Sequence, residues 1–145
     1  LLDMLEQKAA AMNLSERVIF KGLVEREQMP ALYRENDILV MASEHEGMSN
    51  AMLEAIASGL PVITTPCEGV EELIGENGII VNYPNMEGFV AAIKTIALEP
   101  GTYQTMANAG RKTAEKFSWS AVADRYIEQY QQLIHLRKST ARETN

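Results

Sequence analysis

The sequence predicts an α/β fold in which a Rossmann-like parallel sheet carries helices on both faces. Three observations predict it: short apolar patterns typical of strands alternate with helical patterns, the connections are short, and the central strand pattern Asp37–Ala42 is apolar at nearly every position. Such continuous apolar runs are typical of parallel strands that helices cover on both faces. With 145 residues, the chain is long enough for one domain with its own core.

Four segments have the composition of buried strands, because they are short, apolar or β-branched, and bounded by turn residues. They are Arg17–Phe20, Asp37–Ala42, Pro61–Thr65 and Gly78–Val81. The first segment is closed by the Lys21-Gly22 turn. We therefore expect four strands, with ligands at their C-terminal ends, where parallel α/β sheets bind them.

Helical spacing of apolar residues, in steps of three and four, marks the remaining segments. Pro30 fits the first turn of a helix, Ser49 is a candidate N-cap, and Gly59 is a candidate stop signal. The expected helices cover 2–12, 25–35, 49–58, the turn 71–74, a segment marked by Phe89, Ala92, Ile93 and Ile96, then 101–115, and a last helix marked by Trp119, Val122, Tyr126, Tyr130 and Leu133. We expect residues 137–145 to fray.

Composition narrows the classes of function. The chain has 13 Lys and Arg against 20 Asp and Glu, a net charge of −7, so it is a poor candidate for binding nucleic acid. Its single cysteine, Cys67, excludes an internal disulfide, and with only two histidines the chain is a poor candidate for a Cys/His metal site. No apolar run is long enough to predict a membrane-spanning helix. The first residues show neither an initiator Met nor a signal-peptide pattern. We therefore expect this chain to be part of a longer protein.

The segment Ser43–Val62 carries the most chemical information. It runs from the end of an apolar strand through a loop into a helix N-terminus, which offers free N–H groups and the positive end of a helix dipole to an anion. Gly47 allows close approach of a ligand, and Glu46 and Glu54, with seven residues between them, bracket the site. A nucleotide sugar fits, with pyrophosphate at the helix end and sugar hydroxyls at the carboxylates. Spacing alone fits equally well a Glu that merely stabilises the helix start.

The same segment resembles a known signature. Glu46-Gly47-Met48-Ser49-Asn50 through Glu54-Ala55, followed by Ser58-Gly59-Leu60-Pro61-Val62-Ile63, resembles the Glu-x7-Glu motif of retaining GT-B glycosyltransferases of the GT4-type family, the glycosyl transferases group 1. The likeness extends over residues 14 to 136 in register. It includes Val18-x-Phe20-x-Gly22, Leu32-Tyr33, Asp37–Val40 with Ser43, Gly69-x-x-Glu72-Leu73-Ile74 and Asn77–Val81.

The resemblance implies that residues 1–145 are the nucleotide-sugar-binding part of a cytoplasmic hexosyltransferase that uses a UDP- or GDP-hexose in glycan, polysaccharide or glycolipid synthesis. The resemblance also implies that Glu46 is the catalytic residue at the donor sugar and that Glu54 hydrogen-bonds the ribose. The resemblance further places the sugar and phosphates beside Gly47, Met48, Ser49, Asn50 and Leu53, and the base beside Phe20, Lys21 and Gly22. It implies no cofactor and no metal, and the chain has no DxD motif.

The resemblance also indicates what this chain does not contain. The family carries an Arg–Lys pair for the diphosphate on an earlier strand and loop, and its acceptor site on an N-terminal domain; neither matches this sequence. We therefore expect the chain alone to be inactive, with acceptor binding and any peripheral membrane contact left to that domain. Two residues depart from the pattern: Glu68, where many members have Gly, and Met48, where Phe is common.

Other residues favour structural interpretations. His45 is expected to be an exposed loop residue rather than a base, and Cys67 a buried thiol without a base partner. The stripe of Trp119, Tyr126 and Tyr130 favours a packing face over sugar stacking. Two other functions stay open beside the transferase: a non-catalytic binding or interaction module, and a nucleotide-sugar epimerase of the same architecture.

Overall fold

The computed structural model describes residues 1–43, 45 and 48–143, and it contains a parallel sheet of three strands in the order β1-β2-β3. The strands are β1 (Leu39–Met41), β2 (Val62–Thr64) and β3 (Gly78–Ile80). Val62 is in register with Leu39 on one side and with Gly78 on the other. The predicted parallel α/β fold is therefore confirmed.

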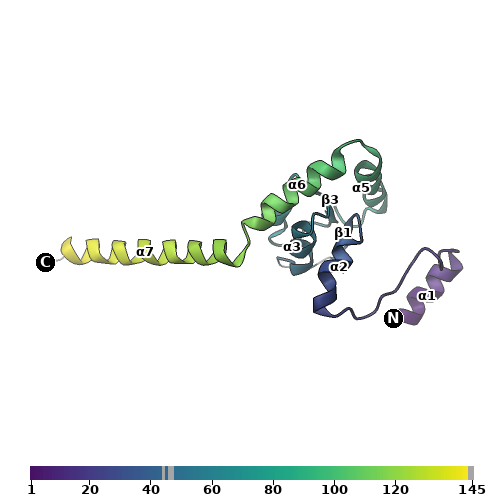
Figure 1. Ribbon diagram of the computed structural model, residues 1–145, viewed down its shortest axis with the longest axis horizontal. Helices are drawn as coiled ribbons and strands as arrows, with labels where there is room; N and C mark the ends of the chain where they lie inside the picture. The colour runs from purple at the N-terminus through teal and green to yellow at the C-terminus, as the bar shows by residue number, and fades with distance from the viewer. Residues whose placement is uncertain (44, 46–47, 144–145) are drawn as a thin grey trace.

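Seven α-helices and one 3₁₀ turn surround or flank this sheet in the described residues. They are α1 (Leu2–Ala11), the turn η1 (Arg26–Gln28), α2 (Met29–Arg34), α3 (Asn50–Ala57), α4 (Val70–Leu73), α5 (Met86–Leu98), α6 (Thr102–Glu115) and α7 (Trp119–Glu143). Figure 1 shows α2 to α6 gathered around the sheet, with α1 lying apart on one side and α7 projecting on the other. We call residues 29–118 the central unit.

The core lies on both faces of the sheet because neighbouring residues of a strand point to opposite sides. Val62 belongs to one buried cluster and Ile63, the next residue of β2, to the other; both are fully buried. The first cluster contains Met52, Ala55 and Ile56 of α3 with Val70 and Leu73 of α4. The second contains Phe89, Ala92 and Ile96 of α5. Helices thus cover both faces, as the sequence predicts.

Local signals explain where the central helices begin and how closely they pack. Asn85 caps α5, since its side chain accepts a hydrogen bond of 2.8 Å from the Gly88 N–H. Gly101, with φ of 82°, precedes α6 in the left-handed conformation. Along α6, Gly110 faces α3 so closely that an added Cβ would lie 3.2 Å from the Ile56 Cβ. The small residue therefore sets the distance between α3 and α6.

The strand expected at Arg17–Phe20 is absent, and the prediction of four strands is wrong. Residues 18–20 have no strand hydrogen bonds, and the Val18 N–H instead bonds the Leu14 carbonyl in a turn. Ile19 is 78% exposed. A strand exists only when a neighbouring strand accepts its hydrogen bonds, and no described strand lies beside this segment.

The two flanking helices, α1 and α7, each have an apolar face at helical spacing, and side chains of both faces are exposed. Leu2 and Met12 are exposed at α1, and on α7 Trp119 is 91% exposed. Tyr126 and Tyr130 stack at 6.3 Å between ring centroids, yet each is 60% exposed. The stripe expected to be a packing face is thus not packed against the described part of the chain. The helix is assigned as far as Glu143, and fraying of residues 137–145 stays a prediction.

Among the described helices, none is long and apolar enough to cross a membrane.

Candidate functional site

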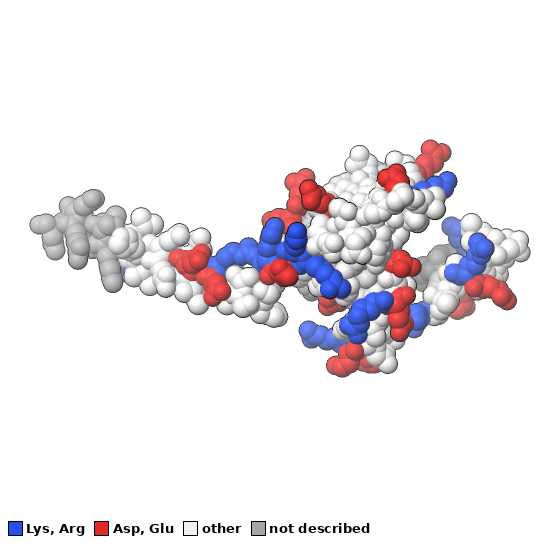
Figure 2. Space-filling view, turned by 45° about the horizontal axis from the view of Figure 1, so that its top comes forward, with Lys and Arg blue, Asp and Glu red and all other residues white. Residues whose placement is uncertain are grey.

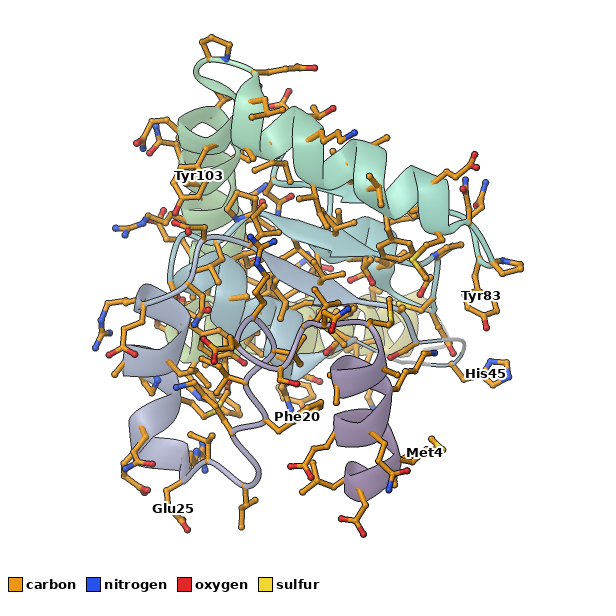
Figure 3. The ribbon with its side chains drawn as sticks, turned by 90° about the vertical axis from the view of Figure 1, so that its right-hand side faces the viewer. Met4, Phe20, Glu25, His45, Tyr83 and Tyr103 are labelled. Carbon is orange, nitrogen blue, oxygen red and sulfur yellow. The ribbon has the colours of Figure 1, made fainter. Side chains whose placement is uncertain are left out.

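The candidate site lies where the three parallel strands end, because the loops that follow them meet at one edge of the sheet. His45 follows β1 and Tyr83 follows β3, and Figure 3 shows both on the same side of the molecule. The loop after β2 lies between these two loops in the strand order. Segments that are distant in sequence therefore combine at this edge.

Helix α3 begins at this edge with the geometry expected for binding an anion. Ser49 precedes it in extended conformation, and the Leu53 N–H makes a bond of 3.1 Å to the Ser49 carbonyl. The predicted N-cap position is confirmed, but the Ser49 side chain makes no cap hydrogen bond; its Oγ lies 3.9 Å from the Met41 Sδ. The first N–H groups of α3 consequently have no partner within the helix and are oriented toward the edge.

Glu54 lies one turn inside α3 and is held by a tyrosine from α2. The buried Tyr33 hydroxyl donates a hydrogen bond to the Glu54 carboxylate. Burial, together with the negative charge and the hydrogen bond of Glu54, raises the pKa of Tyr33 to about 12. Glu54 itself is exposed, so its carboxylate keeps acceptor positions for hydroxyl groups of a ligand. This pair joins α2 to α3 at the site.

Glu54 also lines an open pocket of about 470 Å³. Its walls combine α3 with the end of α6 and the residues after it: Leu53, Glu54, Ala57, Arg111, Ala114, Glu115, Phe117 and Ser118. Arg111 lies over the end of α3, with its Nε 3.0 Å from where a Cβ of Gly59 would be. Spacing in the sequence gives no signal for this pocket, because α3 and α6 are far apart along the chain.

The loops after β1 and β2 are tied to each other at two points. The Thr65 hydroxyl donates a hydrogen bond to the Ser43 carbonyl. Farther along, Gly69 lies against Met48, such that an added Cβ would be 3.7 Å from the Met48 Cα. Gly69 has a φ of 76°, a conformation that favours glycine. Residues 66–68 therefore form an arch, which we call the 66–68 arch, anchored at both ends to the neighbouring loop.

The charges in the part of the sequence that contains the sheet are one-sided. Ten of the 20 acidic residues and none of the 13 Lys and Arg residues lie between positions 35 and 93, the stretch that contains all three strands. Figure 2 shows several of the cations where α7 leaves the central unit. In the sequence, Arg111, Lys112, Lys116 and Arg125 lie between the end of α6 and the first turns of α7. Positive potential at the edge thus comes from the helix N-terminus rather than from side chains of this stretch.

The predicted site residues fall into three groups. Met48, Ser49, Asn50, Leu53 and Glu54 lie together at the start of α3. Glu46 and Gly47 lie outside the described residues. Phe20, Lys21 and Gly22 are exposed on the segment before α2, where Lys21 lines a separate pocket of about 550 Å³ with residues of η1 and α2. Helix α2 connects the groups, since Ala31 and Leu32 line that pocket while Tyr33 bonds Glu54.

His45 and Cys67 also lie on the loops at this edge. His45 is exposed, as expected. Cys67, expected to be buried, is only half-buried and packs against the core cluster that contains α3. Within the described ranges, no group of three His, Cys, Asp or Glu side chains is placed to hold a metal ion. Tyr33 is the residue whose contact the sequence missed, because only the fold brings it to Glu54.

Comparison with known proteins identifies the fold and the family. The family described as glycosyl transferases group 1 matches residues 2–98. A lipopolysaccharide core biosynthesis glycosyltransferase of Rhizobium meliloti is 35% identical over 129 residues, which cover 87% of this chain and 37% of that protein. The chain thus spans little more than a third of this relative's length.

Solved structures agree with this match. The C-terminal domain of a glycosyl transferase group 1 family protein from Francisella tularensis has a TM-score of 0.71 at 29% identity, covering 79% of this chain and 60% of that one. The Anabaena protein HepE, solved in complex with UDP-glucose, has a TM-score of 0.79 at 21% identity, with 90% and 36% covered, and supports the fold alone. The chain, with its parallel sheet of the GT-B type, belongs to the glycosyl transferases group 1.

Proposed function

We propose that this chain binds a nucleoside-diphosphate sugar, a UDP- or GDP-hexose, as the donor part of a cytoplasmic hexosyltransferase that acts with retention in glycan, polysaccharide or glycolipid synthesis. The observation that carries the proposal is the Glu54 carboxylate, exposed to a ligand and oriented by Tyr33, one turn inside the helix that begins at the C-terminal edge of the sheet. A carboxylate accepts hydrogen bonds from a vicinal diol, and a helix N-terminus binds phosphate. Both groups occur in such a donor.

The proposed roles of the individual residues follow from the family resemblance and, for Glu54 and the start of α3, also from this placement. Glu54 bonds the ribose hydroxyls, and the N–H groups at the start of α3, beside Ser49 and Asn50, bind the diphosphate. Glu46 contacts the donor sugar near the reacting carbon. Phe20-Lys21-Gly22 hold the base. The structure of HepE, which shares the fold of this chain, was solved with UDP-glucose, a donor of the proposed class.

The diphosphate requires more positive charge than this edge supplies. No Lys or Arg lies between positions 35 and 93, so the leaving group needs basic side chains from elsewhere. We propose that an earlier strand and loop of the same domain supply an Arg–Lys pair, that an N-terminal domain of the whole enzyme supplies the acceptor site, and that neither a metal nor a cofactor takes part. The isolated chain then binds donor without transferring sugar.

Titration of the chain with UDP and with GDP tests the proposal, followed by amide NMR signals around Ser49 and Glu54. One nucleotide should shift these signals at millimolar concentration. Glu54→Gln should weaken binding about tenfold, because hydrogen bonds to a charged group contribute about 1.5 kcal/mol or more. Tyr33→Phe should weaken it by about threefold, since the carboxylate stays but loses its orientation.

Glu99→Gln is the matched control, because it removes the same charge from an exposed position at the end of α5, at the opposite edge of the sheet. It should leave the affinity unchanged. Absence of any shift at α3 with both nucleotides at millimolar concentration would contradict the proposed donor site.

A further inference from the structure

Glu68 is the one carboxylate of the 66–68 arch, at the C-terminal edge of the sheet. The arch is fixed on both sides of Glu68 by the Thr65 bond to Ser43 and by the contact of Gly69 with Met48. Cys67 packs inward against the core, whereas Glu68 is exposed. The backbone that carries Glu68 is therefore anchored just beyond the end of β2, the middle strand.

Whether Glu68 lies beside the sugar of a bound donor depends on where the arch lies relative to α3. A donor whose ribose lies at Glu54 and whose diphosphate lies at the start of α3 extends its sugar across the loop ends beyond Met48. Gly69 lies close to Met48 there, since an added Cβ would be 3.7 Å from the Met48 Cα, so the arch borders the loop ends that the sugar of such a donor would reach. No Lys or Arg from positions 35–93 neutralises the Glu68 charge.

We propose that Glu68 is a specificity-determining residue of the donor-sugar subsite, which selects neutral hexoses and disfavours sugars that carry a carboxylate or sulfonate. The inference rests on the proposed function, because it assigns the sugar class of that same site. Its physical basis is repulsion between like charges. Two negative charges about 4 Å apart repel by about 1 kcal/mol even in water, which corresponds to a fivefold change in affinity.

A pair of donors that differ in a single group tests this directly. UDP-glucose and UDP-glucuronate differ only at C6, where a hydroxymethyl group is replaced by a carboxylate; GDP-mannose and GDP-mannuronate form the equivalent pair if GDP is the nucleotide that binds. We expect the chain to bind the neutral donor at least fivefold more tightly. Glu68→Gln should reduce this ratio by about fivefold, chiefly by tightening the binding of the charged donor.

Glu76→Gln is the control for a general change of charge. Glu76 is exposed in the turn before β3, at the opposite edge of the sheet, so this variant should keep the wild-type ratio. Raising the ionic strength should diminish the preference of the wild type, because salt screens exposed charges.

The outcomes separate this inference from the proposed function. Equal affinity of the wild type for both donors, or an equal shift of the ratio in Glu68→Gln and Glu76→Gln, overturns the role of Glu68 while nucleotide binding stands. Failure of the wild type to bind UDP and GDP themselves overturns the proposed function, and the role of Glu68 with it.

Discussion

The helices of the central unit and the two flanking helices share one kind of sequence pattern but differ in what they bury. On α3, Met52 and Ile56 are 1% and 0% exposed, whereas Leu133 on α7 is 60% exposed. All three residues recur at helical spacing on an apolar face. The difference teaches that periodicity specifies a helix and its apolar side, while burial depends on which partner surface is present.

The same comparison indicates which part of the chain contributes most to its free energy of unfolding. Both buried clusters lie within the central unit, and the contact between α3 and α6 closes one of them. Since stability grows with the apolar area removed from water, substitutions in the central unit should cost far more than equal substitutions on α7. Four predictions test this difference.

The largest effect is expected for Ile56→Ala on α3. Ile56 is fully buried and touches Gly110 of α6, so the variant leaves a cavity that the two helices cannot close. We expect a loss of about 3 to 4 kcal/mol in the free energy of unfolding, measured by urea denaturation. Ile93→Ala on α5, where the side chain is 40% exposed, should lose about 1 kcal/mol; equal losses would contradict the assigned core.

Gly78→Ala should have the next largest effect. A Cβ at Gly78 would meet the Val62 carbonyl oxygen in the neighbouring strand at a distance far inside van der Waals contact, so β2 and β3 must separate. We expect a loss of about 2 to 3 kcal/mol by thermal or urea unfolding. Gly75→Ala is the matched control, because its Cβ would meet no atom within 4 Å; a similar loss there would show that the strand contact is not the cause.

Tyr33 should make stability depend on pH only under alkaline conditions. Its pKa is about 12 in the folded chain against 10 for a free tyrosine, so its contribution is fully present below pH 10. Between pH 10 and 12 the unfolded state loses the proton first, and roughly 1 to 2 kcal/mol of stability should disappear.

Absorbance of tyrosinate measures this ionisation directly. Of the five tyrosines, the other four are exposed, so one of five should ionise late, and Tyr33→Phe should remove that late step. A late step that persists in Tyr33→Phe would assign it to another residue.

Much of the central unit is predictable from local sequence. Ser49 and Gly101 mark the starts of α3 and α6, and the strand patterns around Val40, Ile63 and Ile79 predict the three strands. These signals are local: N-cap preference, turn residues and β-branched runs depend only on neighbouring residues.

The remainder depends on contacts between distant segments. Val18-Ile19-Phe20 has the pattern of a strand but lacks a described neighbour to pair with. The bond of Tyr33 to Glu54 and the position of Arg111 over Gly59 arise only once α2, α3 and α6 pack together. In the candidate site, the motif residues at the start of α3 could thus be predicted, but the tyrosine that orients Glu54 could not.

The smallest effect is expected for Ile127→Ala on α7, the counterpart of Ile56→Ala. Ile127 is 52% exposed, so truncation removes little buried area, and alanine has the higher helix propensity. The two terms nearly cancel, and the free energy of unfolding from urea denaturation should stay within about 0.5 kcal/mol of the wild type. A loss above about 1.5 kcal/mol would mean that the apolar face of α7 is buried in solution, which would remove the contrast between the central unit and its flanks.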